Sequence, residues 1–376
     1  MGTTRAALLA LPPAASTVAA AWAKLVSVCA LGLVGVPASS RAATAKGVSN
    51  AAFNVMFPAL LFTSTAAVVR AQPTEALATC IVGAGVQITA SAAFGYCVAK
   101  VLNLEGRTFR ETVVASAFGN ATTIPLLLLS GIASAGILPP DVDATTLTGF
   151  LSIYQVGWSV CLWTVAAAYL QGENSDTSFT GVCKRLATPP SMASLTGLAV
   201  GFTPAPVYNL LTGHLDASEG VLMSTVSHAW ADALGFLGTG AQPALAMVLA
   251  LSLAGGGTAS AEDGDVDGGG DDDDDAIVPD VLARQLVGTL IVRCLCLPVF
   301  TGIVDSVHGA SSTFGTADAA VRAVLVLEGC QPTAQVLVLL SQVQGTRSDA
   351  TRIARLLLLQ YVLAIPAMVA WVGYLL

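Results

Sequence analysis

Long apolar runs, separated by short polar segments, fill most of the 376-residue chain. A helix needs about 20 apolar residues to cross the hydrocarbon core of a bilayer. The runs therefore predict an all-α polytopic membrane protein with about ten transmembrane helices. The expected spans are 18–36, 48–69, 75–99, 110–136, 147–170, 190–211, 226–254, 281–304, 320–343 and 353–376. Residues 1–17 are expected to form a lead-in, because Pro12 and Pro13 cut short its apolar stretch.

Two of the runs contain residues that oppose a continuous helix. Gly119 and Pro125 stand inside the fourth run, and Gly329 and Pro332 stand inside the ninth. Glycine is entropically costly in a helix, and proline removes a hydrogen-bond donor and clashes with the preceding turn. Broken backbone at bilayer depth is tolerated only where protein or a wet cavity satisfies the freed polar groups. One interrupted span in each half of the chain points to the binding site of a transporter.

A short polar loop, 171–189, divides the ten spans into two sets of five, in residues 18–170 and 190–376. Because five is odd, the two sets must be inverted relative to each other in the membrane. Two matches support this inverted repeat. A Pro-Ala-Leu sequence begins at Pro58 in the second span and again at Pro243 in the seventh, and the interruption in the fourth span matches that in the ninth.

Composition agrees with a membrane protein, since 54% of the residues are hydrophobic and 11% are charged, against about 25% charged in soluble domains. The net charge of −8 comes from one acidic run. Residues 262–275 hold nine of the 24 acidic residues, and the rest nearly balance the 16 Lys and Arg. We therefore expect segment 255–278 to be a disordered cytoplasmic loop within the second repeat, and the net charge gives no information about partners of the rest of the chain. No nucleic-acid partner is expected.

Several other classes of protein are disfavoured by missing motifs. The eight cysteines are scattered without a Cys-x-x-Cys pair, and the acidic run lacks the order of an EF-hand loop, so no metal or cofactor is predicted. The chain has no His-Glu-x-x-His motif, no paired catalytic aspartates in its spans and no nucleophile beside a histidine, so an intramembrane enzyme is not expected. Ten spans also argue against a seven-helix receptor.

Basic residues are unevenly distributed between the two sets of loops. Cytoplasmic loops of membrane proteins carry an excess of Lys and Arg. The loops after the even-numbered spans and the two termini, which share a side, hold only Arg5, Arg70 and Arg322. We therefore predict that both termini face away from the cytoplasm and that the loops after the odd-numbered spans face it. Those loops hold eleven basic residues: Arg41, Lys46, Lys100, Arg107, Arg110, Lys184, Arg185, Arg284, Arg347, Arg352 and Arg355.

Four stretches of this sequence resemble the auxin efflux carrier family. Asn54–Ser64 is similar to the family's Phe-x-Pro-Ala-Leu-x-x-Ser stretch, and Gly119–Leu126 resembles the Gly-Asn-x-x-x-x-Pro-Leu motif of its first crossover. Val292–Pro298 resembles the family's eighth span, and Pro332–Gln335 occupies the second crossover. The similarity runs from about residue 20 to the end of the chain. The short central loop resembles the PIN-LIKES branch of the family.

The resemblance implies a ten-helix, inverted-repeat carrier whose crossover helices are broken in spans 4 and 9. It also implies transport of an organic anion of the indole-3-acetic-acid type, in the endoplasmic reticulum membrane rather than the plasma membrane. The expected partners are this small anion and the lipid bilayer, with a homodimer also considered. The alternative function is a proton- or sodium-coupled symporter of bile acids or dicarboxylates with a similar architecture, and Glu328 is the feature that favours it.

The two interruptions supply the predicted substrate-binding residues. The free N–H groups at the start of each half-helix can bind a carboxylate at the membrane midplane. Phe57 and Phe62 are expected in an apolar wall for an aromatic ring. Pro125 and Pro332 are expected to create the breaks. The alternative role for the polar side chains is hydrogen bonding between helices. The side chains predicted to bind substrate are Asn120, Thr122, Thr123, Gln331, Thr333 and Gln335.

Two charged residues within the apolar runs are the main candidates for a role in transport, since intramembrane charges are functional hypotheses by default. Glu328 adjoins the second interruption, and Arg293 lies in the eighth span. Glu328 is interpreted as a proton carrier, as a ligand for a coupling cation, or as the ion-pair partner of Arg293. The chain also departs from the usual residues of the PIN-LIKES branch at Thr122, Thr123 and Gln335.

Overall fold

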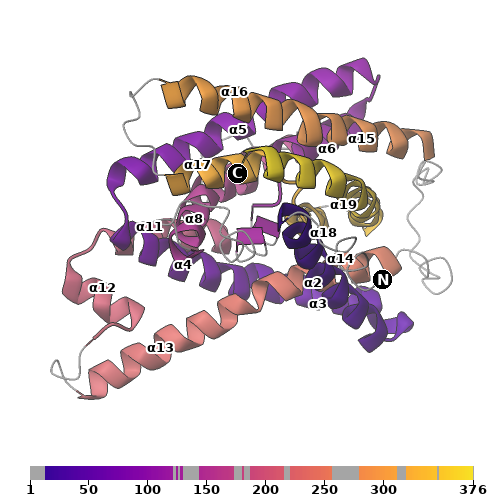
Figure 1. The fold of residues 1–376 in the computed structure, drawn as a ribbon. Helices are drawn as coiled ribbons and strands as arrows, with labels where there is room; N and C mark the ends of the chain where they lie inside the picture. Colours follow the sequence, from indigo (N-terminus) through magenta and orange to yellow (C-terminus); the bar gives the residue numbers. More distant parts are fainter. Residues whose placement is uncertain are drawn as a thin grey trace, which may run out of the picture.

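Helices account for nearly all of the residues that the structure describes (Figure 1). The computed structural model describes residues 13–121, 124–125, 128–129, 144–172, 180–181, 187–215, 221–255, 279–310, 319–344 and 347–375. Within these residues the one β-type pairing is an isolated antiparallel bridge between Gly119 and Thr333. The acidic run 262–275 and most of the predicted lead-in lie outside the described residues, so both remain predictions from the sequence.

The elements follow the order of the apolar runs. Three short π-helical segments, η2 (Ala52–Met56), η3 (Leu162–Ala166) and η6 (Val292–Cys296), continue into longer helices. Such segments are frequent at functional sites. The main helices are α2 (Pro13–Gly35), α3 (Arg41–Ala51), α4 (Phe57–Ala71), α5 (Thr74–Val101), α6 (Gly106–Ala117), α8 (Ala144–Cys161), α9 (Ala167–Gln171), α11 (Pro189–Gly201), α12 (Ala205–Thr212), α13 (Val221–Thr239), α14 (Ala241–Gly255), α15 (Pro279–Ile291), α16 (Leu297–Ala310), α17 (Ala319–Gly329), α18 (Val336–Gln344) and α19 (Arg347–Leu375).

Six helical stretches among the described residues are long and apolar enough to cross a membrane, which supports a polytopic membrane protein. A shorter apolar helix covers Ala23–Gly35. The count of ten spans and the inverted repeat remain predictions. The six stretches are Ala38–Ala71, Thr74–Val101, Gly149–Gln171, Val221–Leu251, Pro279–Ser306 and Thr351–Gly373.

Two predicted spans differ from the observed helices. The single span expected over 190–211 is instead two helices, because α11 ends at Gly201 and α12 begins after Pro204. A proline at this position cannot continue the hydrogen-bond pattern of the preceding turn. The second span begins earlier than predicted, since Arg41 and Lys46 lie in α3 rather than in a loop. Their long apolar stems let them extend a helix toward the membrane surface.

The helices pack in two groups that meet at the centre of the molecule (Figure 1). In one group α4 packs against α11 and α13, while α14 packs against α2 and α3. In the other group α5 packs against α6, α8 and α17, while α15 packs against α19. The groups touch where α8 meets α4 and α11, and where α14 meets α18 and α19. The two interrupted segments, 118–121 and 330–335, are buried between these helices.

Candidate functional site

The two interrupted segments meet and cross in antiparallel orientation. Helix α6 ends at Ala117, and helix α17 ends at Gly329, so both breaks fall where glycine and proline predicted them. The Asn120 main-chain N–H donates to the carbonyl of Pro332 at 2.7 Å, and the Ala334 N–H donates to the carbonyl of Phe118 at 2.9 Å. The freed backbone groups of each break are thus satisfied by the other break. We call this pair of segments, 118–121 and 330–335, the crossover.

Asn120 lies inside the crossover, and its amide makes contacts at both ends. Its Nδ2 donates to the hydroxyl of Tyr361 at 2.9 Å. Its Oδ1 accepts the main-chain N–H of Ile124 at 3.4 Å, which caps the first turn of the chain after the break. The side chain is buried. In this conformation Asn120 therefore stabilises the crossover.

The predicted residues of the second break are also buried. Thr333 donates its hydroxyl to the carbonyl of Ala115 at 2.7 Å, which links the second break to the end of α6. Gln331 donates its Nε2 to the carbonyl of Leu327 at 3.0 Å. Gln335 stands directly before α18, at the start of the second half-helix. The structure thus brings Asn120, Gln331, Thr333 and Gln335 into one region.

Of the remaining predicted residues, the structure describes the two prolines but not the two threonines of the first break. Pro125 is buried within a helical turn just after the first break, and Pro332 lies in the second break, where its carbonyl accepts from Asn120. Thr122 and Thr123 lie outside the described residues, so their predicted role in binding is not tested.

Arg293 supplies a buried positive charge at the crossover. It extends from η6, and 2% of its surface is exposed. Its Nε donates to the carbonyl of Gln331 at 2.7 Å, its Nη1 to that of Ser116 at 3.4 Å, and its Nη2 to that of Glu328 at 3.3 Å. The guanidinium therefore binds the carbonyl ends of α6 and α17, where helix dipoles concentrate negative charge.

Gly119 is required by the position of Arg293. A Cβ atom built at Gly119 would lie 1.8 Å from Nη2 of Arg293, and any larger side chain would displace the guanidinium. The absence of a side chain at Gly119, just beyond the end of α6, therefore leaves room for the cation.

The contact between Glu328 and Arg293 differs from the predicted ion pair. Arg293 binds the main-chain carbonyl of Glu328, and within the described residues no ion pair joins its carboxylate to a basic side chain within 4.0 Å. The carboxyl group is buried, and its Oε1 has no hydrogen-bond partner there. The two charges share a region without a direct bond between them.

Three further residues, which lie outside the crossover and hydrogen-bond to it, were not predicted from the sequence. Gln155 of α8 donates to the carbonyl of Ala121 at 2.7 Å, and the Oε1 atom of Gln360 of α19 accepts from the main-chain N–H of Thr333 at 3.3 Å. Tyr361 accepts from Asn120 and donates to the carbonyl of Thr333 at 2.8 Å. Polar residues inside apolar helices were the signal that could have identified them.

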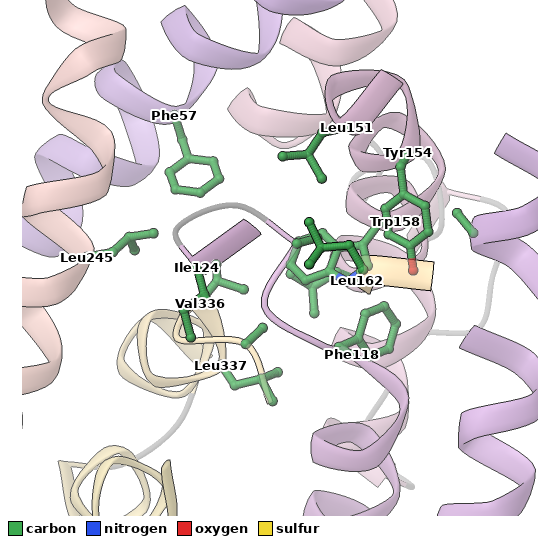
Figure 2. Close-up of a cluster of buried hydrophobic side chains, with 14 of the residues drawn as sticks. Phe57, Phe118, Ile124, Leu151, Tyr154, Trp158, Leu162, Leu245, Val336 and Leu337 are labelled. Atoms are coloured by element: carbon green, nitrogen blue, oxygen red, sulfur yellow. The ribbon is translucent and has the colours of Figure 1, made fainter. Parts of the chain in front are cut away.

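Apolar side chains surround the crossover (Figure 2). Figure 2 shows Phe57 and Leu245 on one side and Trp158 on the other, next to Phe118 of the crossover itself, with Ile124 between the two sides. The rings of Phe118 and Trp158 meet edge to face, with centroids 5.8 Å apart. Phe57 belongs to the buried apolar cluster around the crossover, and its contact with a substrate ring remains a prediction. The prediction for Phe62 is wrong, because Phe62 packs in a separate cluster with Ala66, Val200 and Tyr208.

Helical bundles with two broken helices crossing at a buried polar centre are typical of membrane transporters. The family model described as membrane transport protein matches residues 17–372, and the chain belongs to this family. The family includes the auxin efflux carriers, in agreement with the resemblance seen in the sequence. A comparison with curated proteins finds no significant match.

Proposed function

We propose that this protein is a carrier that moves an organic anion of the indole-3-acetic-acid type across a membrane by alternating access at the crossover. Membership in the membrane transport protein family supports the carrier function. The observation that carries the proposal is the antiparallel pairing of the two breaks around the buried Arg293. A fixed cation between two broken helices suits a small anion better than a cation or a neutral solute.

The substrate carboxylate binds where the half-helices begin. The main-chain N–H groups at the start of α18 present a positive dipole end. Gln335, which directly precedes α18, and Asn120 in the first break supply neutral hydrogen-bond groups. Arg293 lies at the opposite, carbonyl ends of α6 and α17. It therefore acts on the anion through its field, without a direct bond that would hold the substrate too tightly.

The apolar wall receives the ring of the substrate. Phe57, Phe118 and Trp158 offer aromatic surface beside the polar crossover (Figure 2). A pocket with apolar walls and a few polar groups binds an aromatic acid in one orientation. Because the residues of the crossover are buried in this conformation, the substrate enters only after the helix groups move apart.

The two halves of the chain act as inverted repeats in this proposal. Each half supplies one glutamine from its fifth span to its own break, since Gln155 binds Ala121 and Gln360 binds Thr333. This equivalence supports two five-helix units, 18–170 and 190–376, with opposite orientations. The resemblance to the PIN-LIKES branch supports the endoplasmic reticulum membrane as the location.

The proposal is tested by uptake into proteoliposomes of the purified protein. Labelled indole-3-acetate, malate and taurocholate are compared with and without sodium, and protein-free liposomes correct for passive entry. We expect saturable uptake of indole-3-acetate without a sodium requirement. Uptake of malate or taurocholate alone would point to the symporter alternative, and no uptake of any anion would refute the proposal.

The variant Asn120→Ala tests the crossover as the site of transport. We expect it to lower uptake per folded protein by at least about tenfold, because it removes a polar group of the site and the cap of the following turn. Asn54→Ala is the matched control, since Asn54 is exposed and, among the described residues, its side chain bonds to the carbonyl of Asn50 one turn earlier. Equal uptake by the two variants would remove Asn120 from the site.

A further inference from the structure

Glu328 is a buried carboxyl group that the proposed anion site does not use. Its side chain is 1% exposed, and Oε1 has no hydrogen-bond partner among the described residues. It is the last residue but one of α17 and stands directly before the crossover. A carboxylate in such a position is expensive to keep charged unless a cation or several N–H groups compensate it.

Arg293 is committed to other partners. Its guanidinium donates to the carbonyls of Ser116, Glu328 and Gln331, which lie at or just beyond the ends of α6 and α17. These carbonyls use the hydrogen-bond donors of Arg293, so the guanidinium makes no direct bond to the carboxylate of Glu328.

The other groups around Glu328 are neutral at ordinary pH. Tyr154 from α8 and Cys330 from the break lie within electrostatic range, with Cys294 of η6 beside Arg293. Helix α5 contributes Gln87, which binds Tyr154, Thr301 and the carbonyl of Leu325. Helix α16 contributes Thr301, which lies against Gly329. Arg293 is thus the one charged group that faces Glu328 in the described part of the chain.

We propose that Glu328 binds a proton that travels with the substrate anion, so that anion and proton cross the membrane together. This inference rests on the proposed function and names its coupling ion. A metal cation is disfavoured as the coupling ion, because Arg293 already places a positive charge beside the carboxyl group. A metal cation would also need a shell of oxygen ligands. A proton needs none, since it adds directly to Oε1 or Oε2 of Glu328.

The coupling follows from charge. With a proton on Glu328, the crossover presents the field of Arg293 and of the N-terminus of α18, and the anion binds. When the carboxyl group releases its proton to water on the other side, a negative charge appears next to the anion and favours its release. By linkage, bound anion strengthens proton binding by the same factor. One proton and one anion then move as an electrically neutral pair.

The test is the pH dependence of counterflow, in which labelled indole-3-acetate enters liposomes preloaded with unlabelled anion at equal pH inside and outside. The carboxyl group of indole-3-acetate, like those of Asp and Glu, is ionised throughout pH 6 to 8. We expect the half-saturating concentration of the wild-type protein to rise by up to about tenfold per pH unit within this range, because one proton is linked to binding.

Variants separate Glu328 from other titrating groups. In Glu328→Gln the half-saturating concentration should lose its dependence on pH, whereas Glu328→Asp should retain it. Glu75→Gln is the matched control, because it removes the same charge from an exposed position at the start of α5 and should keep the wild-type dependence. A wild-type protein without pH dependence, or a Glu328→Gln variant that retains it, would overturn the inference.

A measurement on the wild-type protein does not rely on folding of any variant. In detergent and weak buffer at about pH 7.5, a pH indicator should report uptake of up to one proton for each anion bound. Anion binding without proton uptake would overturn the inference while leaving the proposed function standing. Absence of counterflow with any tested anion would instead refute the proposed function.

Discussion

Asn120, Tyr361 and Thr333 form a chain of hydrogen bonds that holds the crossover together. Tyr361 uses its hydroxyl both as acceptor, from Asn120, and as donor, to the carbonyl of Thr333. All three side chains are buried, so water does not replace a lost partner in this conformation. One hydroxyl group therefore joins helix α19 to both interrupted segments.

The variant Tyr361→Phe should destabilise the protein. It keeps the ring but removes the hydroxyl, so Asn120 and Thr333 each lose a buried partner. We expect a loss of about 1–3 kcal/mol in the free energy of unfolding, measured by thermal unfolding in detergent. Tyr208→Phe is the control, because the hydroxyl of Tyr208 has no hydrogen bond in the described residues. Equal effects of the two variants would contradict this role of Tyr361.

The sequence predicted only some of the individual residues of the candidate site. Asn120, Gln331 and Thr333 could be chosen because they adjoin glycine and proline inside apolar runs. Gln155 and Tyr361 lie in uninterrupted helices, where a polar side chain can face any neighbouring helix. Only the three-dimensional packing decides which neighbour it faces. For the same reason the sequence could not exclude Phe62 from the apolar wall.

An ion pair between Glu111 of α6 and Arg352 of α19 joins these two helices away from the crossover. The buried carboxylate of Glu111 accepts from Nε of Arg352 at 3.1 Å and from Nε of Arg107, one turn earlier, at 3.2 Å. Arg352 is mostly covered, since 22% of its side chain is exposed. Removing one partner would leave a poorly solvated charge behind.

A double-mutant cycle with Glu111→Gln and Arg352→Met should show a coupling of about 1–3 kcal/mol, because the pair is largely shielded from water. The measurement is thermal unfolding of the two single variants and the double variant in detergent. The pair of Asp280 and Arg284 is the matched control, since both side chains are exposed, and its coupling should stay below about 1 kcal/mol. Comparable couplings for both pairs would show that α6 and α19 do not depend on this contact.

The positions of the helices were predicted better than their continuity. Apolar runs identified α5 and α19 because length and hydropathy suffice for an uninterrupted membrane helix. The break between α11 and α12 escaped this criterion, although Pro204 marks it, because hydropathy averages over a proline. The three π-helical segments also leave no hydropathy signal, since one extra residue in a turn does not change composition.

For the whole molecule, the distribution of basic residues predicts that both termini lie on the side away from the cytoplasm. Epitope tags at both termini should therefore resist protease in sealed microsomes, whereas a tag inserted within 256–278 should be cleaved. Detergent, which opens the vesicles, should expose all three tags. Cleavage of the terminal tags in sealed vesicles would reverse the predicted orientation.

At the same scale the class of protein was evident from composition, and the resemblance named the family that the comparison with family models then showed. The number of spans was not fixed in this way. Helix α6 has 12 residues and α18 has nine, so each is too short to cross a bilayer alone. Two half-helices form one membrane span only if they lie end to end across the bilayer, and the sequence does not show their relative positions.

The close approach of Arg293 to Gly119 has a consequence for inherited variation. Every missense change in a glycine codon adds at least one carbon atom, and at Gly119 that atom would overlap a guanidinium nitrogen. Gly35, Gly47 and Gly235 have open space around the same position. Codon 119 should therefore be depleted of missense alleles in natural populations, while those three codons accumulate them.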